Sequence, residues 1–335
     1  MGRLTRGASR MGAARTFAPT EGACAQSTPA RHAVVVLNPA AGRGTGARRR
    51  EDLEALLAAE AATRRCPFAW RILETRAPGD AARLARAAAA DGADLLVAAG
   101  GDGTLSEVVN GIAGSGVRLG IVPLGTGNDF ARELGVHASL GRSVHTLIHG
   151  VPRRVDLGRA GDRWFINVAG CGFDAAVAAR VNRGFRRLRG TTAYLAAVCL
   201  ELCRLRPTGI AVAVDDRTIE MRGLLCAMAN SPSYGGGMRI APDARIDDGL
   251  LDVFLLAEAG RLEFLRAFPR VFRGAHVNHP KVTLLRARRV AVETASPLPV
   301  LIDGEVWGTT PMQCHVVPGA IEVMAPASAD RTGPR

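Results

Sequence analysis

Lysine is almost absent from this chain of 335 residues. Lys281 is its only lysine, so arginine supplies nearly all of the positive charge. A P-loop needs a lysine at the end of its glycine-rich turn, and the protein-kinase fold needs one on an early strand. No lysine precedes residue 281, which excludes both of these large phosphotransferase classes.

Aromatic residues are also scarce, at 4% of the chain, although the formal net charge is +12. Such a charge favours a polyanionic partner, which can be a nucleic acid or an anionic membrane surface. Nucleic-acid-binding modules commonly stack bases on aromatic side chains, and no stacking motif accompanies the basic runs of this chain. We therefore expect no nucleic-acid partner.

Long apolar runs are missing as well. The longest nearly apolar stretches, such as Thr191–Cys203 and Leu95–Gly101, fall well short of the ~18 residues that cross a bilayer. Residues 1–31 lack the continuous apolar core of a secretory signal. We predict no membrane-spanning helix, a disordered extension at 1–31 and a disordered tail at 326–335.

The seven cysteines are scattered, without a Cys-x-x-Cys pair or a metal-ligand spacing. This usage is typical of a reduced, cytoplasmic setting. Cys199 and Cys203 would share one helix face, and we predict that they are small core side chains there.

The first half of the chain alternates short apolar runs with helical patterns rich in Ala, Leu, Glu and Arg. This order is typical of a parallel sheet covered by helices, so we predict a doubly wound α/β domain over residues 32–154. The expected strands are Ala33–Leu37, Phe68–Leu73, Asp94–Ala98 and Arg118–Val122, and the expected helices are Ala47–Ala62, Asp80–Ala90 and Thr104–Ile112.

The second half has a different texture, with short β-like runs separated by turn residues from Val155 onward. We predict a β-sandwich domain over residues 155–325, interrupted by helical segments at about 175–205 and 261–272. The expected strands are Trp164–Val168, Ile210–Val214, Leu224–Met228, Leu251–Leu256, Val282–Leu285, Arg289–Val292, Val300–Ile302, Met312–Val317 and Ile321–Met324.

Three glycine-rich turns each follow a predicted strand of the first domain, at the edge where open α/β sheets bind ligands. The first runs from Asn38 to Gly46. Its glycines allow backbone N–H groups to approach phosphate oxygens, and the helix that follows adds a favourable dipole. A tight strand-to-helix connection is the alternative.

The second turn, Gly100–Thr104, places three glycines around Asp102. This pattern predicts a cradle of N–H donors with one carboxylate, suited to Mg²⁺ held against phosphates. The alternative is that Asp102 or Thr104 caps the next helix.

The third turn, Pro123–Arg132, also follows a strand. Thr126 and the adjacent N–H groups would contact nucleotide or substrate, and Asp129 would help to place a hydroxyl group. On the alternative interpretation, Asn128 and Asp129 only cap the next helix.

These motifs resemble the catalytic domain of the diacylglycerol kinase family, which includes bacterial soluble lipid kinases and sphingosine and ceramide kinases. The resemblance spans about residues 33–325 and rests on four motifs in order: Asn38–Gly42, Gly100–Thr104, Gly125–Arg132 and Ile302–Glu305. The second motif also occurs in NAD kinases and phosphofructokinases, whereas the third is characteristic of the lipid branch.

The resemblance implies an ATP site between the two domains. The family often has Asn where this chain has Ser106, which still offers a donor and an acceptor. We add Arg43 from its position, because no P-loop lysine can supply positive charge. The expected nucleotide contacts are Asn38, Pro39, Ala40, Ala41, Gly42, Arg43, Thr75, Gly100, Gly101, Asp102, Gly103, Thr104, Leu105, Ser106 and Thr126.

An acidic loop, Pro242–Asp252, carries four carboxylates in the second domain. Hard cations prefer such oxygen ligands, although Asp-Gly turns between strands are also commonly just solvated. The resemblance implies a structural Mg²⁺ bound by Asp248 and by the carbonyl groups of Arg245 and Leu250.

Three carboxylates are the expected catalytic residues. The resemblance implies that Glu305 is the general base that accepts the proton of the acceptor hydroxyl; an exposed glutamate in a β-turn is the alternative. Asp102 would face Mg²⁺, and the resemblance suggests a hydrogen-bonded network of Asp129 and Asp156 with Arg43. Because phosphoryl transfer depends mainly on positioning and charge neutralisation, loss of Asp102 should cost more activity than loss of Glu305.

Two arginine-rich segments indicate a membrane surface. Residues 180–206 carry seven arginines against Glu201, and residues 261–273 place Leu265, Phe268 and Phe272 between arginines. Basic amphipathic stretches of this kind can lie among anionic headgroups. A solvated helix covering the β-domain is the alternative.

Together these features predict an ATP-dependent lipid kinase, acting on diacylglycerol at the inner face of the membrane with Mg²⁺. A kinase of a soluble metabolite, similar to NAD kinases, and a non-catalytic nucleotide-binding regulator stay open as alternatives. The acceptor lipid and the oligomeric state, including a homodimer paired through β-domain edges, are not determined by the sequence.

Overall fold

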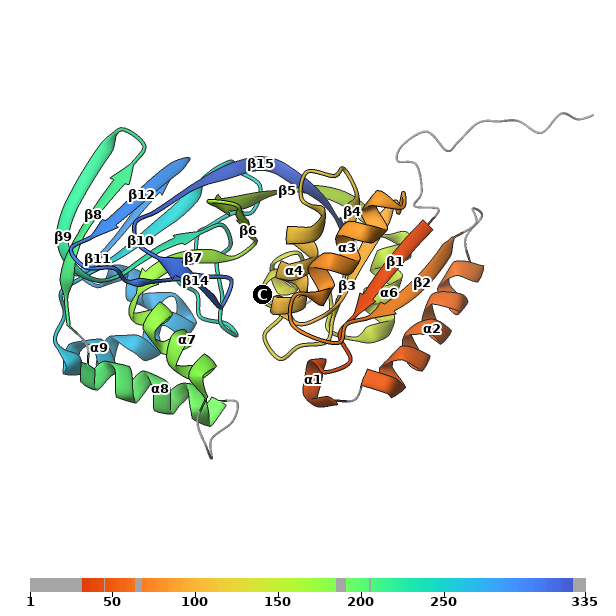
Figure 1. The fold of residues 1–335 in the computed structure, drawn as a ribbon, viewed down its shortest axis with the longest axis horizontal. Coiled ribbons are helices and arrows are strands. Elements are labelled where there is room, and N and C mark those ends of the chain that lie inside the picture. The colour runs from red at the N-terminus through yellow and green to blue at the C-terminus, as the bar shows by residue number, and fades with distance from the viewer. Residues whose placement is uncertain (1–31, 45, 64–67, 185–190, 205, 328–335) are drawn as a thin grey trace, which may run out of the picture.

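A computed structural model describes residues 32–44, 46–63, 68–184, 191–204 and 206–327 (Figure 1). The predicted extension at 1–31 and most of the predicted tail lie outside these ranges. The described chain forms a mixed sheet whose parallel N-terminal strands carry helices, followed by an antiparallel, sandwich-like domain. This is the fold class that the sequence predicts.

The first domain is built on four parallel strands in the order β4-β3-β1-β2. Alternate side chains of β1 point to opposite faces, because side chains in a strand alternate. Val34 and Val36 pack with α3 and α4, whereas Val35 and Leu37 pack with α2 and α6. The elements are β1 (His32–Leu37), α1 (Ala41–Gly44), α2 (Gly46–Ala62), β2 (Ala69–Glu74), α3 (Asp80–Ala90), β3 (Leu95–Gly100), α4 (Asp102–Ile112), β4 (Arg118–Pro123), α5 (Asp129–Glu133) and α6 (Leu140–His149).

The second domain is antiparallel, and its inward-facing side chains form a core shared by most of its strands. Helices α7, α8 and α9 gather on one side of it, at the lower left of Figure 1. The elements are β5 (Val151–Ala160), β6 (Arg163–Phe165), β7 (Val168–Gly172), α7 (Phe173–Arg183), α8 (Thr191–Arg204), β8 (Thr208–Val214), β9 (Arg217–Ala229), β10 (Leu251–Ala257), α9 (Arg261–Ala267), the 3-10 helices η1 (Phe268–Arg273) and η2 (Ala275–Asn278), β11 (Val282–Ala287), β12 (Arg289–Thr294), β13 (Pro299–Ile302), β14 (Glu305–Thr309) and β15 (Met312–Ala325).

The last strand joins the two domains. The sequence predicts two strands, at 312–317 and 321–324, but β15 is one strand with an irregularity between Val317 and Ile321. Its first part pairs with β12, its residues 314–317 and 321–325 pair with β5, and Val323 near its end pairs with Leu119 of β4. The sheet of the first domain therefore includes residues from the far end of the chain, and β5 contains the predicted boundary at 154/155.

The helices of the second domain differ from the prediction in two respects. The helical segment predicted at about 175–205 is two helices, α7 and α8, and residues 185–190 between them are outside the described ranges. Cys199 and Cys203 are exposed, so the prediction of core side chains is wrong. Among residues 196–204 of α8, whose side chains are described, the buried ones are Ala197, Val198 and Leu202. Within the described part of the chain, no helix has the length and apolar character needed to span a bilayer.

Candidate active site

The three glycine-rich turns meet at the carboxyl ends of β1, β3 and β4. The N–H of Asn38 donates to the carbonyl of Ala99 at 2.9 Å, and the N–H of Leu124 donates to the carbonyl of Gly100 at 2.8 Å. The first bond continues the pairing of β1 with β3 by one residue, and the second continues the pairing of β3 with β4. The turns therefore start side by side. We call the surface formed by residues 38–44, 100–104 and 125–129 the glycine-turn site.

Glycine is required where these turns touch. Gly42 has a φ of +62°, and a Cβ atom there would lie 2.5 Å from the carbonyl oxygen of Leu124. A Cβ atom on Gly125 would lie 2.6 Å from the Cα atom of Gly101. Real Cβ atoms do not approach backbone atoms so closely, so a side chain at either position would push the turns apart.

Asn38 links the first turn to the second. Its Nδ2 donates to Oγ1 of Thr104 at 3.0 Å, and its Oδ1 accepts from the N–H of Ala40 at 3.0 Å. The amide of Asn38 therefore shapes its own turn and fixes the start of α4. Arg43 belongs to α1, but its side chain lies outside the described part of the structure.

Asp102 joins the second turn to the third. Its Oδ2 accepts from the N–H of Asn128 at 2.7 Å, and its Oδ1 accepts from the N–H of Asp129 at 2.9 Å. Burial and the nearby charge of Asp129 raise the pKa of Asp102, and three backbone N–H donors, those of Asn128, Asp129 and Phe130, oppose this rise. Each carboxylate oxygen has a second acceptor position, so Asp102 can hold the turns together and still face a cation.

Asp129 connects the third turn to the second domain. Its buried carboxylate accepts from Nη1 of Arg132 at 2.8 Å and from the N–H of Gly236 at 2.7 Å. Asp156 binds other amides, those of Gly249 and Gly319. The carboxylate of Asp129 is thus engaged with backbone and arginine donors, a role that its sequence position did not indicate.

Asp303 forms a second connection between the domains. Its carboxylate accepts from the N–H groups of Ile166, Asn167 and Val168 at 2.8–3.2 Å and from the hydroxyl of Ser106 on α4. Burial raises the pKa of Asp303 to about 6 against the effect of these four donors. The hydroxyl of Ser106, an expected nucleotide contact, is therefore directed to the second domain.

Asp303 lies within the fourth sequence motif, Ile302–Glu305, and that motif alone indicates no role for it. The available signal was its place before a glycine, because an Asp-Gly pair marks a tight turn. The structure shows φ values of +46° at Asp303 and +88° at Gly304, in the hairpin between β13 and β14. This turn places the carboxylate of Asp303 beside the amides of residues 166–168, just before and at the start of β7, and Glu305 follows the turn directly.

Glu305 begins β14 and is paired with an arginine. Its Oε2 lies 2.9 Å from Nη2 of Arg163, and the guanidinium of Arg163 lies over the ring of Trp307 at 4.1 Å from the centroid. The side chain of Glu305 is 46% exposed, whereas that of Arg163 is 17% exposed. The predicted general base is accordingly reachable from solvent and positioned by a cation that the sequence did not single out.

The remaining expected nucleotide contacts differ in their surroundings. Thr75 follows β2, and its N–H donates to the carbonyl of Leu37 at 2.9 Å, which places it beside the first turn. Gly103 and Thr126 are exposed at the glycine-turn site. The side chain of Leu105 is buried in the core, and its N–H donates to the carbonyl of Gly101 at 3.0 Å, so Leu105 supports the turn by packing.

The acidic loop of the second domain gathers several oxygen ligands. The carboxylate of Asp248 accepts from the N–H of Leu250 and pairs with Arg286, whereas Arg245 pairs with Asp247. Oδ2 of Asp252 is buried and has no hydrogen-bond partner among the described residues. Burial raises the pKa of Asp252 to about 6; Arg286 opposes the rise, and Asp248 and Asp243 add to it.

This loop fits a hard cation by its chemistry. A buried carboxylate oxygen without a donor carries a desolvation cost that a cation would offset. Asp248, the expected ligand, lies close enough to Asp252 to influence its pKa, and both offer the oxygen atoms that Mg²⁺ and Ca²⁺ prefer.

An apolar pocket lies under α7, α9 and the 3-10 helices of the second domain. It contains about 730 Å³ of space free of protein atoms, part of which is open to solvent. Its walls are mostly aliphatic and aromatic, with Asp174, Glu263, His276 and His279 as polar members. Asp174 lies in the first turn of α7 and accepts from the hydroxyl of Tyr234 at 3.3 Å, and burial raises the pKa of Asp174 to about 6.

Aromatic rings connect this pocket to the surface. Ring centroids are 4.6 Å apart for Phe173 and Phe264, 6.0 Å for Phe264 and Phe268, and 6.1 Å for Phe268 and Phe272. Phe173 and Phe264 are buried, whereas Phe272 is 48% exposed. A continuous apolar path therefore runs from the pocket to the outside of the molecule.

Comparisons with known proteins agree with this geometry. The model of the diacylglycerol kinase catalytic domain matches residues 32–160, and that of the YegS C-terminal NAD kinase beta sandwich-like domain matches residues 167–325. A diacylglycerol kinase of Mycobacterium tuberculosis is 38% identical over 254 residues, which cover 74% of this chain and 82% of that protein. The chain belongs to the diacylglycerol kinase family.

Further members of the diacylglycerol kinase family show the same similarity. A diacylglycerol kinase of Bacillus subtilis is 36% identical over 240 residues, covering 71% of this chain and 79% of that protein. The crystal structure of a putative diacylglycerol kinase from Bacillus anthracis superposes with a TM-score of 0.73 at 24% identity, covering 90% of this chain and all of that one. This structural likeness supports the fold, and the sequence identity carries the family assignment.

Proposed function

We propose that this member of the diacylglycerol kinase family transfers the γ-phosphoryl group of ATP to the hydroxyl of diacylglycerol, giving phosphatidic acid. The observation that carries the proposal is the apolar pocket of the second domain. One strand, β7, runs from this pocket toward Asp303, the residue that contacts α4 beside the glycine-turn site. A nucleotide site alone would suit many acceptors, whereas this pocket suits acyl chains.

The strand β7 makes this link. Val168 at its start donates to Asp303, which contacts α4 through Ser106, and Phe173 just beyond its end lines the pocket. Five residues of strand span about 16 Å, at ~3.3 Å per residue. An acyl chain reaches about 15 Å, half of the ~30 Å hydrocarbon core of a bilayer. A lipid with its acyl chains in the pocket can therefore place its hydroxyl group near Asp303 and Ser106, where the two domains meet.

The glycine-turn site would bind the phosphates of ATP. Backbone N–H groups of the three turns can donate to phosphate oxygens, and the helix dipole at the start of α4 adds to this attraction. Asp102 accepts from the amides of the third turn and would also bind Mg²⁺. When bound, this ion would supply charge neutralisation to the phosphates.

Glu305 would accept the proton of the lipid hydroxyl. The hydroxyl oxygen forms a bond to the γ-phosphorus, the bond from that phosphorus to the β-phosphate oxygen breaks, and ADP leaves with the bond electrons. Arg163 holds the carboxylate of Glu305 at one oxygen and leaves the other available. Because the transition state is loose, a base of ordinary strength is sufficient.

The acidic loop would hold a second, structural Mg²⁺. Asp248 and the carbonyl groups of Arg245 and Leu250 are the proposed ligands, and the unpartnered oxygen of Asp252 supports a cation in this loop. Arg286, which pairs with Asp248 and lies near Asp252, supplies positive charge to the loop in the described structure.

Residues 261–273, which form α9 and η1 beside the pocket, are here called the pocket mouth, and this surface would rest on the inner face of the membrane. Leu262, Leu265 and Phe272 are 70%, 50% and 48% exposed, and they alternate with arginines 261, 266, 270 and 273. Exposed apolar side chains can enter the headgroup region, and each nearby cation adds ~1 kcal/mol of attraction to an anionic surface. Only part of the arginine-rich segment 180–206 is described, and there α8 packs against the second domain.

A panel of acceptors tests the proposal. Purified protein with Mg²⁺ and γ-labelled ATP would be given diacylglycerol in mixed micelles, a short-chain water-soluble analogue, and NAD. We expect label in diacylglycerol, less in the analogue, and none in NAD. Label in NAD alone would instead support a soluble-metabolite kinase, the candidate favoured by the match of the second domain to an NAD kinase-like sandwich.

A variant that fills the pocket separates lipid binding from catalysis. Ala267 lines the pocket and is half-buried, so Ala267→Trp would occupy space that acyl chains need. We expect at least a tenfold loss of kcat/KM for the long-chain lipid and little change for the short-chain analogue. An equal loss for both acceptors would contradict a role of the pocket in acyl-chain binding.

A further inference from the structure

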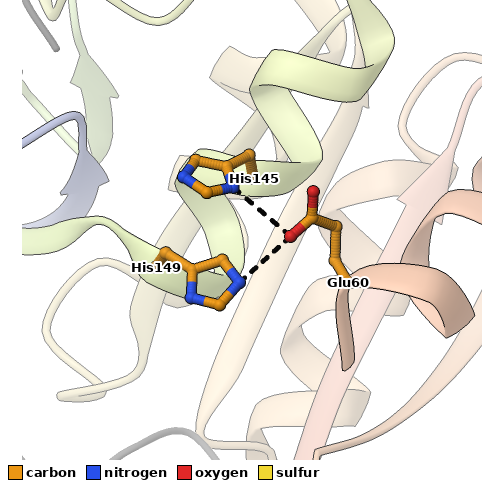
Figure 2. A group of neighbouring side chains, drawn as sticks. All are labelled: Glu60, His145 and His149. Atoms are coloured by element: carbon orange, nitrogen blue, oxygen red, sulfur yellow. Dashed lines mark hydrogen bonds and ion pairs between the residues drawn. The ribbon is translucent and has the colours of Figure 1, made fainter. Parts of the chain in front are cut away.

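Glu60, His145 and His149 form a cluster on the first domain that the proposed reaction does not use (Figure 2). Glu60 lies near the end of α2, and the two histidines lie on the last turns of α6. Four residues separate the histidines, so both rings project from one face of the helix; their centroids are 4.6 Å apart. Figure 2 shows both rings directed toward the carboxylate of Glu60.

The distances within the cluster match those between ligands of a tetrahedral metal ion. Oε2 of Glu60 lies 3.3 Å from Nδ1 of His145 and 3.0 Å from Nε2 of His149, and all three ligand atoms lie within 4.8 Å of one another. Zinc binds imidazole nitrogen and carboxylate oxygen at ~2.0–2.2 Å, which places tetrahedral ligands about 3.4 Å apart. Two of the three separations are already close to this value.

Packing of the two helices fixes the ligands in advance. Leu53 and Leu57 of α2 share a buried core with Val144, Leu147 and Ile148 of α6. A site carried by two packed helices keeps its geometry without a bound ion, which lowers the entropic cost of binding. The side chains of Glu60, His145 and His149 are 27%, 51% and 31% exposed, so an ion can enter from solvent and keep a water ligand.

Hydrogen bonds alone satisfy this cluster poorly. One carboxylate oxygen faces both rings, and Nε2 of His149 also lies 3.2 Å from Oγ1 of Thr63. The Thr63 hydroxyl donates to the carbonyl of Glu60 at 2.7 Å, so a neutral His149 must share one proton between two acceptors. A cation at the centre would remove this competition.

We propose that Glu60, His145 and His149 bind a zinc ion that links α2 to α6. Two imidazoles and one carboxylate favour a borderline metal such as Zn²⁺, whereas Mg²⁺ prefers six oxygen ligands. Neutral histidines with one carboxylate leave a net positive site when the divalent ion is bound.

The proposed zinc site is separate from the glycine-turn site, but α2, which carries Glu60, also contacts the third glycine-rich turn. Arg49, on the first turns of α2, donates to the carbonyl of Leu124 in the third turn at 3.3 Å. Glu60 lies eleven residues further on, about 16 Å along the helix at 1.5 Å per residue. Zinc would therefore stabilise α2, the helix that supports the third glycine-rich turn, and the ion itself would lie away from the glycine-turn site.

Metal binding by the full chain tests the proposal directly. Metal-free protein would carry Cys199→Ser and Cys203→Ser, because these exposed cysteines are four residues apart on α8 and could bind zinc themselves. Equilibrium dialysis with Zn²⁺, and the visible absorption of Co²⁺ as a spectroscopic substitute, would be measured in excess Mg²⁺. We expect one ion per chain and a rise of the melting temperature with zinc.

Two variants and one control locate the site. His145→Ala and His149→Ala should each weaken zinc binding by at least about tenfold, since even the loss of outer-shell partners costs 10–100-fold. Both side chains are partly exposed, so folding should be retained, and far-UV circular dichroism would verify it. His315→Ala, at an exposed histidine of β15, should leave zinc affinity unchanged.

Two results would overturn the proposal. Either the parent protein shows no saturable zinc binding, or the His145→Ala and His149→Ala proteins bind zinc as tightly as the His315→Ala control. Both readouts are independent of phosphoryl transfer, so the zinc site and the proposed kinase activity stand or fall separately.

Discussion

The two sides of the proposed reaction are built in different ways. The glycine-turn site consists mainly of backbone, with turns so close that a Cβ atom at Gly42 or Gly125 would meet backbone atoms at 2.5–2.6 Å. The apolar pocket, where we propose that the lipid binds, consists of side chains from α7, α9, the 3-10 helices and several strands. Phosphates need donors at fixed positions, whereas acyl chains need only apolar area.

This difference predicts unequal tolerance to substitution. The positions of the backbone N–H donors depend on each glycine that lets the turns approach and on the carboxylates that hold the turns together. An apolar wall can exchange one side chain for another of similar size at a cost that is usually below about 1.5 kcal/mol. Substitutions on the phosphate side should therefore affect the rate, and those on the lipid side should affect affinity.

The largest effect is expected for Asp102→Asn. The variant loses the charge that we propose faces Mg²⁺, and it replaces one acceptor of the Asn128 and Asp129 amides by an NH₂ group. We expect kcat to fall by about 10³, because preorganised electrostatic contacts are worth 10²–10³ or more each. Label transfer in mixed micelles measures this, and an unchanged kcat in a protein with normal circular dichroism would refute the role.

Glu305→Gln should have the next largest effect. The neutral amide cannot accept the hydroxyl proton, and we expect kcat to fall by about 10², at the low end for a general base. The KM for ATP should not change. Arg163→Gln is the matched variant, and it should lower kcat less because Glu305 keeps its carboxylate. A Glu305→Gln loss greater than that of Asp102→Asn would reverse the order proposed here.

Gly125→Ala tests the backbone contact on the phosphate side. Its Cβ atom would meet Gly101, and overpacking of this kind costs about 1–3 kcal/mol. We expect a lower melting temperature and roughly a tenfold lower kcat, because the displaced turns would misplace the phosphates. Gly141→Ala is the control, since nothing lies within 4 Å of a Cβ atom there, and it should raise stability by up to about 1 kcal/mol.

The smallest effect on catalysis is expected at the pocket mouth. The double variant Leu262→Ser and Leu265→Ser removes two exposed apolar side chains. Loss of partial insertion of two leucines, at about 1 kcal/mol each or less, should weaken vesicle binding roughly tenfold. Activity in mixed micelles should be nearly unchanged. Vesicle sedimentation measures the first value, and unaltered sedimentation would exclude this surface as the membrane contact.

Much of the first domain follows from local sequence. The strands and glycine-rich turns are continuous segments whose residue types dictate their conformation, and strand alternation brings the turns to one edge of the sheet. The fold class is confirmed. The joining of the turns by Asp102 could not be derived, because a carboxylate in a glycine-rich turn can equally cap its own helix.

Contacts between distant segments were beyond sequence reasoning. Ser106 and Asp303 are almost 200 positions apart, and nothing near either residue indicates their hydrogen bond. Glu60 and His145 come from separate helices that pack through unremarkable leucines and valines. The irregularity at 317–321 hides the continuity of β15, since a break in alternation reads as a break in the strand.

The course of β15 has a consequence for protein synthesis. Ile321 and Val323 lie in the core of the first domain, although more than 160 residues separate them from β5, the strand beside them. A ribosome must therefore complete the second domain before the final strand of the first can enter its sheet. The nascent first domain therefore has one edge of β4 unpaired until β15 has been synthesised, and an unpaired strand edge is prone to aggregation.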